Sequence, residues 1–287
     1  MSLGPIGRER PGIPLRAVIP NAVTALALCA GLTGIRFGIS AEWDKALMFI
    51  GFAAVLDGMD GRIARMLKGQ SRFGAELDSL SDVVAFGVAP ALIAYLWVLR
   101  AWTPYGWIFA LVYAVCMALR LARFNARIDV EEQPHKSAGY LTGVPAPAGA
   151  GVMLLPILLW LASNRQWTWL QDYRLMAAWA SLSAFMIISS FATFSLGSLR
   201  LKRNVRLEAI VLIAILGAAL LSAPWETLSV IVLVYLALIP FSMLRYARFR
   251  RSKASSAGGP ASEPIQPALP LPNDRPARRR RSEPNEP

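Results

Sequence analysis

The sequence contains few of the residues on which many soluble and secreted proteins rely. Its 287 residues include two cysteines, Cys29 and Cys116, and one histidine, His135. The cysteines lie far apart inside apolar runs, which excludes a disulfide framework or a cysteine-type zinc site and favours a packing role. His135 lies in a charged loop and is predicted to be solvated, so a histidine-based mechanism or metal site has no support.

Charged residues are also scarce. Only 17% of the chain is Asp, Glu, Lys or Arg, 55% is hydrophobic, and the mean hydropathy is +0.44. These values lie outside the usual range of soluble domains. A soluble fold would need a larger apolar core than one domain of this length normally builds. The composition therefore predicts an all-α protein, a polytopic bundle of transmembrane helices.

Long apolar runs divide the chain into candidate spans. A spanning helix needs about 20 mainly apolar residues, and by this measure we predict about eight. Seven is the alternative, because the run 205–222 is short and a tight turn follows it. The predicted spans are residues 17–40, 44–67, 73–99, 104–126, 142–163, 172–196, 205–222 and 225–246.

The basic residues assign a side of the membrane to each loop. Lys and Arg are dense before the first span and after the second, fourth, sixth and eighth, and sparse elsewhere. Because cytoplasmic loops carry an excess of Lys and Arg, both termini are expected in the cytoplasm. Tryptophans near span ends on the opposite face fit an interfacial aromatic belt. They are Trp102, Trp107, Trp160, Trp167, Trp169 and Trp225.

Three parts follow from this pattern. Residues 1–16 are predicted to be a cytoplasmic N-terminal segment, 17–250 the transmembrane domain, and 251–287 a disordered, basic, Pro-rich cytoplasmic tail. The arginine run at residues 278–281 is either solvated or adheres weakly to anionic headgroups. We expect an integral protein of the cytoplasmic (inner) cell membrane, with membrane lipid as a partner and no nucleic acid.

Residues 57–82 contain four aspartates and lie between apolar runs that are typical of membrane helices. Ionisable residues inside membrane segments are functional by default. At about 100° per residue, one predicted helix carries five polar or small residues within an arc of about 140°, and the next carries three on one face. The first set is Asp57, Asp60, Gly61, Ala64 and Arg65, and the second is Gly74, Asp78 and Asp82. A polar break at residues 68–71 favours a turn, so the acidic faces of an antiparallel pair can meet.

Four carboxylates in a partly desolvated site repel one another, and a divalent cation relieves that repulsion. Hard oxygen ligands favour Mg²⁺, Mn²⁺ or Ca²⁺. Two such ions about 3.5–4 Å apart can polarise a phosphoryl group and activate the attacking oxygen. Small residues let a flat ring or phosphate approach the backbone, and Arg65 is placed to answer phosphate charge. The residues alone therefore indicate metal-assisted phosphoryl transfer at the membrane surface, with its site on the cytoplasmic side.

The spacing also carries a family resemblance. The stretch reads D-x-x-D-G-x-x-A-R, eight residues, then G-x-x-x-D-x-x-x-D. It resembles the signature of the CDP-alcohol phosphatidyltransferases, and the resemblance extends over roughly residues 15–205. It implies that Asp57, Asp60 and Asp78 hold two Mg²⁺ or Mn²⁺ ions. It also implies that Asp82, itself placed among the metal ligands, removes the proton from an alcohol that attacks the β-phosphorus of a CDP-linked lipid, releasing CMP.

The same resemblance implies contacts to the CDP-lipid. In the family, a Pro-Asn-x-x-Thr at the start of the first span faces the pyrophosphate, whereas the residues alone indicate only a helix start. The implied set is Asn21, Thr24, Gly61, Ala64, Arg65 and Gly74. A homodimer is expected from the family alone.

Three further stretches bear on the alcohol. "ELDSLSDVVAFGVAPA", "ALRLARFN" and "GVPAPAGAG" resemble the integral-membrane branch that uses serine, which implies CDP-diacylglycerol and L-serine as substrates, whereas "FATFSLGSLRLKR" departs from the family by lacking an early basic residue. Arginine suits the carboxylate of serine, so Arg120, Arg123 and the adjacent Asn125 are predicted serine contacts. Positive-inside anchoring accounts for the arginines equally well.

Other functions remain open from the sequence. Glycerol phosphate, inositol phosphate or choline could replace serine in the same chemistry. A membrane cation transporter would also use aspartates, but it would need polar residues at several depths, whereas these lie at one edge. A membrane scaffold with a basic tail would leave the spacing of the aspartates unexplained.

Overall fold

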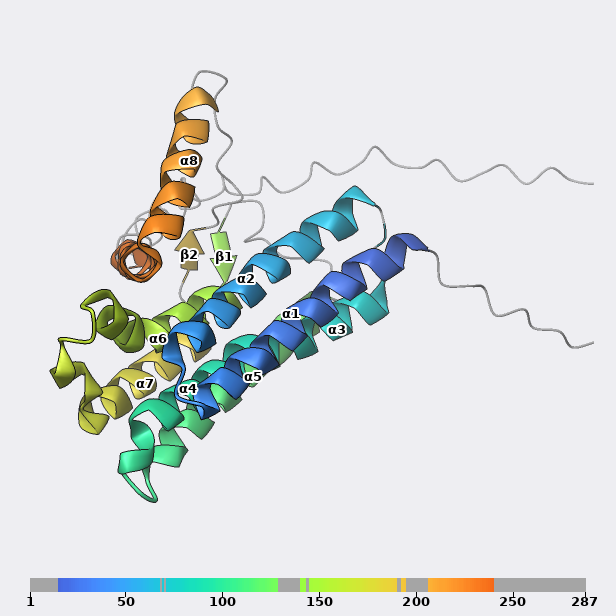
Figure 1. The fold of residues 1–287 in the computed structure, drawn as a ribbon. Coiled ribbons are helices and arrows are strands. Elements are labelled where there is room, and N and C mark those ends of the chain that lie inside the picture. Colours follow the sequence, from blue (N-terminus) through green and yellow to red (C-terminus); the bar gives the residue numbers. More distant parts are fainter. Residues whose placement is uncertain are drawn as a thin grey trace, which may run out of the picture. The chain divides into compact units, whose positions relative to one another are not determined.

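The computed structural model describes residues 15–67, 69, 71–128, 140–142, 145–189, 192–194 and 206–239. Helices dominate this part of the chain (Figure 1). In chain order the elements are α1 (Leu15–Ile39), α2 (Trp43–Met66), α3 (Arg72–Asp82), the π-helix η1 (Val83–Val88), α4 (Ala89–Trp97), the 3₁₀ turn η2 (Leu99–Ala101), α5 (Gly106–Ile128), β1 (Tyr140–Thr142), α6 (Ala146–Ala162), the 3₁₀ turn η4 (Thr168–Gln171), α7 (Tyr173–Ile188), β2 (Ala192–Phe194) and α8 (Arg206–Ser222). A further helix, Pro224–Ile239, follows α8 and is called the 224–239 helix below.

Each predicted span corresponds to a helical stretch, and α3, η1 and α4 together fill the third one. The sixth prediction is wrong at its end, because α7 stops at Ile188 and β2 occupies residues predicted to be helical. There the backbone pairs antiparallel with β1, which takes Thr142 from the start of the fifth predicted span. The sequence had indicated no strands.

Three helical stretches are long and apolar enough to cross a membrane, namely Val18–Ile39, Arg72–Trp97 and Gly106–Ala126. Four shorter apolar helices accompany them, from Ala146, Tyr173, Ile210 and Pro224 onward. Many large apolar side chains on these helices point outward, for example Leu26 at 56% exposure and Leu212 at 66%. Such an extended apolar surface fits a protein whose helices contact lipid, so the chain is an integral membrane protein.

Small residues bring the helices together. In Figure 1, α1 runs alongside α2 and α3 and also contacts α4, and two of its glycines pack closely, one against α2 and one against η1. A Cβ on Gly34 would lie 3.1 Å from the Ala46 carbonyl oxygen in α2. On Gly31 it would lie 2.7 Å from the Ala85 Cα in η1. These contacts fix α2 and the helix carrying α3 on either flank of α1.

The π-helix η1 begins directly after Asp82 and is held tightly. Its Ala85 and Phe86 are buried, and the fully buried Tyr113 of α5 donates a hydrogen bond from its hydroxyl to the Phe86 carbonyl oxygen at 3.2 Å. A Cβ on Gly87 would lie 3.2 Å from Met117. π-helical turns are rare and occur frequently beside functional sites. The position of η1 therefore fits a functional role for Asp82, the residue directly before it.

Several sequence predictions lie outside the described residues. They concern the tail 251–287, nearly all of the N-terminal segment 1–16, and the solvated loop that holds His135.

Candidate active site

The last three turns of α2 carry the first half of the acidic motif. Helical geometry places Asp57, Asp60 and Ala64 on one side, because residues three and four apart are neighbours on a helix. Asp60 is only 5% exposed. Gly61 has no atom within 4 Å of where a Cβ would stand, so the helix surface beside Asp60 is open.

The second half of the motif lies on α3. The side chain of Ser71 caps the helix by accepting a hydrogen bond from the Gly74 backbone N–H at 3.0 Å. This cap starts α3 at Arg72 and fixes the phase in which Asp78 and Asp82 follow, one turn apart. The aspartates thus come from two consecutive helices joined by a short turn, as the spacing predicted.

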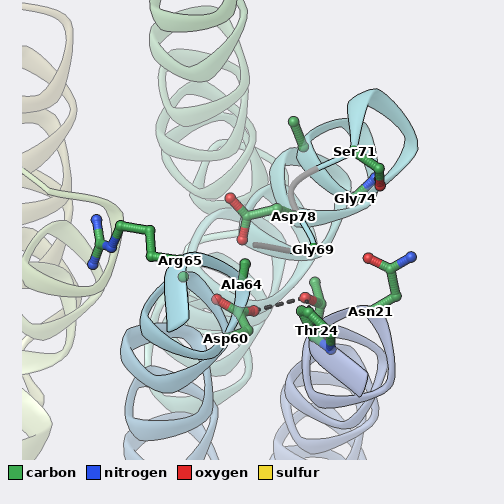
Figure 2. A pocket seen from close by; sticks show the side chains of 12 residues that line it. Asn21, Thr24, Asp60, Ala64, Arg65, Gly69, Ser71, Gly74 and Asp78 are labelled. Atoms are coloured by element: carbon green, nitrogen blue, oxygen red, sulfur yellow. Dashed lines mark hydrogen bonds between the residues drawn. The ribbon is translucent and has the colours of Figure 1, made fainter. Parts of the chain in front are cut away.

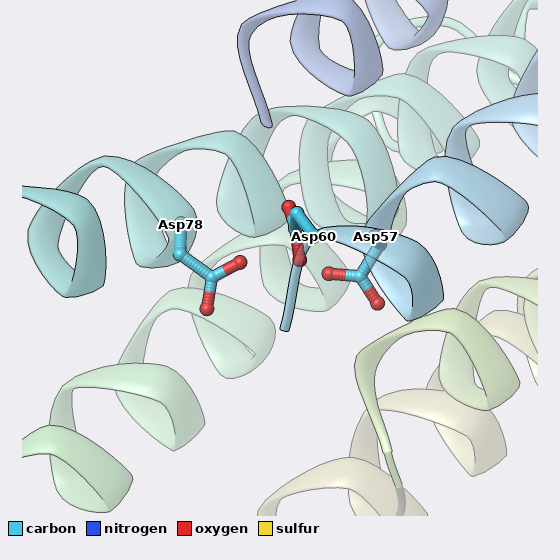
Figure 3. A group of neighbouring side chains, drawn as sticks. All are labelled: Asp57, Asp60 and Asp78. Carbon is cyan, nitrogen blue, oxygen red and sulfur yellow. The ribbon is translucent and has the colours of Figure 1, made fainter. Parts of the chain in front are cut away.

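Three of the four aspartates converge. Carboxylate oxygens of Asp57, Asp60 and Asp78 all lie within 4.8 Å of one another, with Asp60 between the other two in Figure 3. No basic side chain is within 4.0 Å of them among the described residues. An all-carboxylate set of this kind suits hard divalent cations such as Mg²⁺ or Mn²⁺, which neutralise the charge and accept oxygen ligands. The residues present therefore fit a metal centre.

Helix α1 holds Asp60 in place. The hydroxyl of Thr24 lies 2.7 Å from the Asp60 Oδ2 atom and donates to it, and Thr24 is only 4% exposed (Figure 2). Ser81 of α3 in turn donates from its hydroxyl to the Thr24 backbone carbonyl oxygen at 3.3 Å. Thr24 was predicted only as a lipid contact. Its bond to a metal-site carboxylate gives it an orienting role that sequence spacing could not reveal, since 36 residues separate the two.

A cavity of about 450 Å³ opens beside the cluster. All six predicted CDP-lipid contacts line it, together with two of the four aspartates (Figure 2). Its walls are Pro20, Asn21, Thr24, Asp60, Gly61, Ala64, Arg65, Gly69, Ser71, Gly74, Ala75 and Asp78. The cavity is thus formed by α1, the end of α2, the following turn and the start of α3.

Two lining residues differ from the expectation in detail. A Cβ on Gly74 would stand 2.7 Å from the Asn21 Oδ1 atom, so this glycine permits the close approach of α3 and α1 besides lining the cavity. The side chain of Arg65 points away from Thr24, Asp60 and Asp78 in Figure 2. It contributes to the wall from α2 without directing its guanidinium at the carboxylates.

Asp82 lies beside the cluster and outside the cavity wall. It is next to Asp57, close enough for a side-chain hydrogen bond between the two carboxyl groups, and neither belongs to the cavity wall among the described residues. The Arg120 guanidinium of α5 interacts electrostatically with Asp82. The four aspartates therefore have different surroundings, since Asp60 and Asp78 line the cavity, whereas Asp82 interacts with Asp57 and Arg120.

The three predicted serine contacts have different partners in the structure. Arg120 interacts electrostatically with Asp82 and lies close to the Met117 sulfur, at 3.9 Å from its Nη1 atom. Arg123 is exposed and donates from Nη1 to the Ile188 carbonyl oxygen at the end of α7, at 3.2 Å. Asn125 donates from Nδ2 to the Ser79 Oγ atom at 2.8 Å, tying α5 to α3 beside Asp78. Of these three residues, Arg120 is the one that interacts with an aspartate of the acidic motif in the described part of the chain.

Comparison with known proteins agrees with this geometry. The profile of the family described as CDP-alcohol phosphatidyltransferase matches residues 17–188. A second profile, CDP-alcohol phosphatidyltransferase 2, matches residues 204–240, which contain α8 and the 224–239 helix. The sequence alone had given those two helices little diagnostic value.

Curated relatives extend the match over most of the chain. A Mycobacterium tuberculosis protein named CDP-diacylglycerol–serine O-phosphatidyltransferase is 39% identical over 236 residues, covering 82% of this chain and 81% of the relative. A Helicobacter pylori protein of the same name is 32% identical over 226 residues, covering 76% and 88%. A Bacillus subtilis protein of that name is 37% identical over 147 residues, covering 49% and 79%.

Proposed function

The chain belongs to the CDP-alcohol phosphatidyltransferase family, and we propose that it transfers the phosphatidyl group of CDP-diacylglycerol to the hydroxyl of L-serine. The products are phosphatidylserine and CMP. The observation that carries the proposal is the cluster of Asp57, Asp60 and Asp78, two of which line the same cavity as the predicted CDP-lipid contacts. The shared name of the Mycobacterium tuberculosis and Helicobacter pylori relatives supports serine as the alcohol.

The cavity is the proposed site of the cytidine and pyrophosphate. Gly61, Ala64 and Gly74 leave its walls without bulky side chains, so a planar base can lie against the helices. Asn21 supplies an amide that can hydrogen-bond a base or phosphate. Arg65 is proposed to reach the pyrophosphate by a change of side-chain rotamer, since the residue lines the wall and is exposed.

The carboxylates of Asp57, Asp60 and Asp78 are the proposed holders of two divalent ions, Mg²⁺ or Mn²⁺, with Asp82 beside them. When bound, such ions neutralise phosphate charge and polarise the phosphoryl group. Thr24 keeps one ligand in a single orientation through its hydrogen bond to Asp60. Groups that hydrogen-bond metal ligands commonly serve in this way.

Asp82 is the proposed general base. Its carboxylate accepts the proton of the serine hydroxyl while the serine oxygen forms a bond to the β-phosphorus. The bond from that phosphorus to the CMP oxygen breaks, and CMP leaves with the electron pair. Phosphoryl transfer requires the attacking and leaving oxygens to lie roughly in line on opposite sides of phosphorus. The position of Asp82 beside Asp57 and outside the cavity wall supports this assignment.

Serine is assigned to the side of Arg120, whose guanidinium suits a carboxylate. Arg123 and Asn125 were also predicted as serine contacts. We now assign them to supporting the same region, because one binds the end of α7 and the other binds Ser79 on α3.

The topology and assembly complete the proposal. We place the active site on the cytoplasmic face of the cell membrane, because the turn between α2 and α3 carries Lys68 and Arg72 and alternates with loops poor in basic residues. Eight spans with both termini in the cytoplasm follow from the same pattern. A homodimer is proposed from the family.

The test is the alcohol dependence of CMP release by the purified full-length protein, supplied with CDP-diacylglycerol and Mg²⁺ or Mn²⁺. Serine is expected to release CMP and to yield phosphatidylserine, and a chelator is expected to stop both. Glycerol phosphate, inositol phosphate and choline serve as parallel arms. Release with one of these and none with serine would contradict the substrate assignment, and release that ignores the chelator would contradict the metal centre.

A further inference from the structure

Helix α3 carries two of the four aspartates but buries little of its surface. All eleven of its residues belong to the described part of the chain, and Ser81 is the one that is buried, at 3% exposure. Its apolar residues Phe73 and Leu80 are exposed, at 68% and 65%. Helices in proteins are held mainly by burying an apolar face, and α3 buries no apolar side chain fully. Its position therefore depends on a few specific contacts with neighbouring helices.

Two contacts join one face of α3 to α1. A Cβ on Gly74 would lie 2.7 Å from the Asn21 Oδ1 atom, so the helices approach closely there. The Ser81 hydroxyl donates to the Thr24 backbone carbonyl oxygen at 3.3 Å. Gly74 and Ser81 are about two helical turns apart and therefore share this face. Contacts along one face hold two helices together, but they do not by themselves stop one helix from rolling against the other.

Asn125 of α5 holds the other side of α3. Its Nδ2 atom donates to the Ser79 Oγ atom at 2.8 Å, in a partly buried position. The Ser79 hydroxyl gives its own proton to the Ala75 carbonyl oxygen at 3.0 Å, so its oxygen serves as the acceptor for the amide. At about 100° per residue, Ser79 and Ser81 lie about 200° apart around α3. The two serines thus tie α3 to α5 and to α1 on nearly opposite sides, which fixes its rotation about its own axis.

The direction of the Asp78 side chain depends on this rotation. Asp78 precedes Ser79 directly, and one of its carboxylate oxygens lies within 4.8 Å of carboxylate oxygens of Asp57 and Asp60. Because those two aspartates are carried by α2, a roll of α3 would move Asp78 away from them. Hydrogen bonds from Ser, Thr and Asn side chains are a common means of fixing helices against one another in membranes.

We propose that Asn125 is a positioning residue, which holds α3 through its hydrogen bond to Ser79 in the rotation that brings Asp78 to the metal centre. The inference rests on the proposed function, in particular on its metal centre, and deepens it. It gives Asn125 a role in metal binding in place of the predicted contact with serine. The amide acts through α3 and touches neither the metal nor the reacting atoms.

The test measures Mn²⁺ binding to the purified full-length protein, by loss of the EPR signal of free Mn²⁺ before any substrate is added. Asn125→Leu removes the amide donor at similar bulk, and Ser79→Ala removes the acceptor. Each variant should bind Mn²⁺ about 10-fold more weakly, the lower end of the effect of losing a group that orients a metal ligand. Ser79→Thr keeps a hydroxyl and should bind Mn²⁺ as the wild type does. Ser181→Ala is the matched control, because the Ser181 hydroxyl donates to the Ala177 carbonyl oxygen of its own helix.

The double variant shows whether the two residues act as one contact. If they do, Asn125→Leu combined with Ser79→Ala weakens Mn²⁺ binding little more than either change alone, which is the signature of coupled residues. A full additional loss overturns the inference. So does a lower unfolding temperature with unchanged Mn²⁺ affinity, since the bond would then be merely structural. A higher KM for serine in Asn125→Leu alone, with unchanged Mn²⁺ affinity, would return Asn125 to the serine contacts. These outcomes leave the proposed function intact, whereas wild-type protein that binds no Mn²⁺ overturns the metal centre and the inference with it.

Discussion

The two halves of α2 are built in opposite ways. In residues 43–56, Ala46, Ile50 and Ala53 are buried, and Gly34 of α1 packs directly against Ala46 and Ile50. In residues 57–66, Gly58 and Gly61 have no atom within 4 Å of a Cβ position, and the helix borders a cavity. Close packing in the first half fixes the helix in the bundle, and open polar space in the second half admits a ligand. Substitutions in the two halves should therefore fail in different ways.

The largest effect is expected from the aspartates of α2. Asp60→Asn should lower turnover more than about 100-fold, because metal polarisation contributes several kcal/mol and each 1.4 kcal/mol is about tenfold. Asp44→Asn, the same change at the other end of the helix, should leave turnover nearly unchanged, since Asp44 is exposed and pairs with Arg165. CMP release at saturating metal measures both. A similar loss of CMP release in both variants would contradict the functional difference between the two halves of α2.

The next largest effect is expected from the hydrogen bond that the Thr24 hydroxyl donates to Asp60. Thr24→Val keeps the shape of the side chain and removes the hydroxyl that lies 2.7 Å from Asp60 Oδ2. Loss of such a bond to a metal ligand predicts a metal affinity lower by about 10–100-fold. The activation of CMP release by Mn²⁺ should shift to higher concentration by that factor. Thr33→Val is the control, because the Thr33 hydroxyl donates only to the Cys29 carbonyl oxygen of its own helix. If CMP release by the two variants depends on the Mn²⁺ concentration in the same way, Thr24 does not orient a metal ligand.

Two glycines give a third comparison, Gly34 of α1, which packs against the first half of α2, and Gly61 in the second half. Gly34→Val should destabilise the protein by about 1–3 kcal/mol, since the added atoms meet Ile50 and the Ala46 carbonyl oxygen. Gly61→Ala meets no atom within 4 Å and should leave the unfolding temperature unchanged, while its methyl group enters the cavity and raises the KM for CDP-diacylglycerol. Thermal unfolding in detergent and substrate titration separate the two. A stability loss at residue 61 that equals the loss at residue 34 contradicts the prediction.

The smallest effect is expected at the ion pair. Arg165 Nη2 lies 2.6 Å from Asp44 Oδ2, and both side chains are about half exposed, at 57% and 41%. Exposed pairs contribute about 0.2–1 kcal/mol, so Arg165→Gln should shift the unfolding temperature only slightly and leave turnover alone. A measurable loss of CMP release in this variant would mean that the first half of α2 also serves the site.

The sequence predicted the helices and the acidic cluster well, because both depend on local periodicity. The phase of Asp57, Asp60 and Asp78 follows from 3.6 residues per turn, and their convergence needs only a short turn between α2 and α3. Contacts between distant segments were not predictable in this way. Asn125 and Ser79 are 46 residues apart, and nothing in either local pattern indicates their hydrogen bond.

The remaining differences also have physical causes. The β1–β2 pair forms from two three-residue strands, too short to show an alternating pattern. The side-chain direction of Arg65 depends on rotamer choice, which spacing along a helix does not determine.

Because of the π-helix η1, the orientation of Asp78 and Asp82 depends on the number of residues between Asp82 and α4. In an α-helix each residue turns the chain by about 100°, so removing one residue from Val83–Val88 would rotate everything before it by that angle relative to α4. Phe86 and Gly87 are fixed by Tyr113 and Met117, so the rotation would fall on Asp78 and Asp82. A single-residue deletion could therefore misdirect both acids while retaining every functional side chain. In alignments of such proteins, the number of residues between the last aspartate and the buried helix would be as informative as the aspartates themselves.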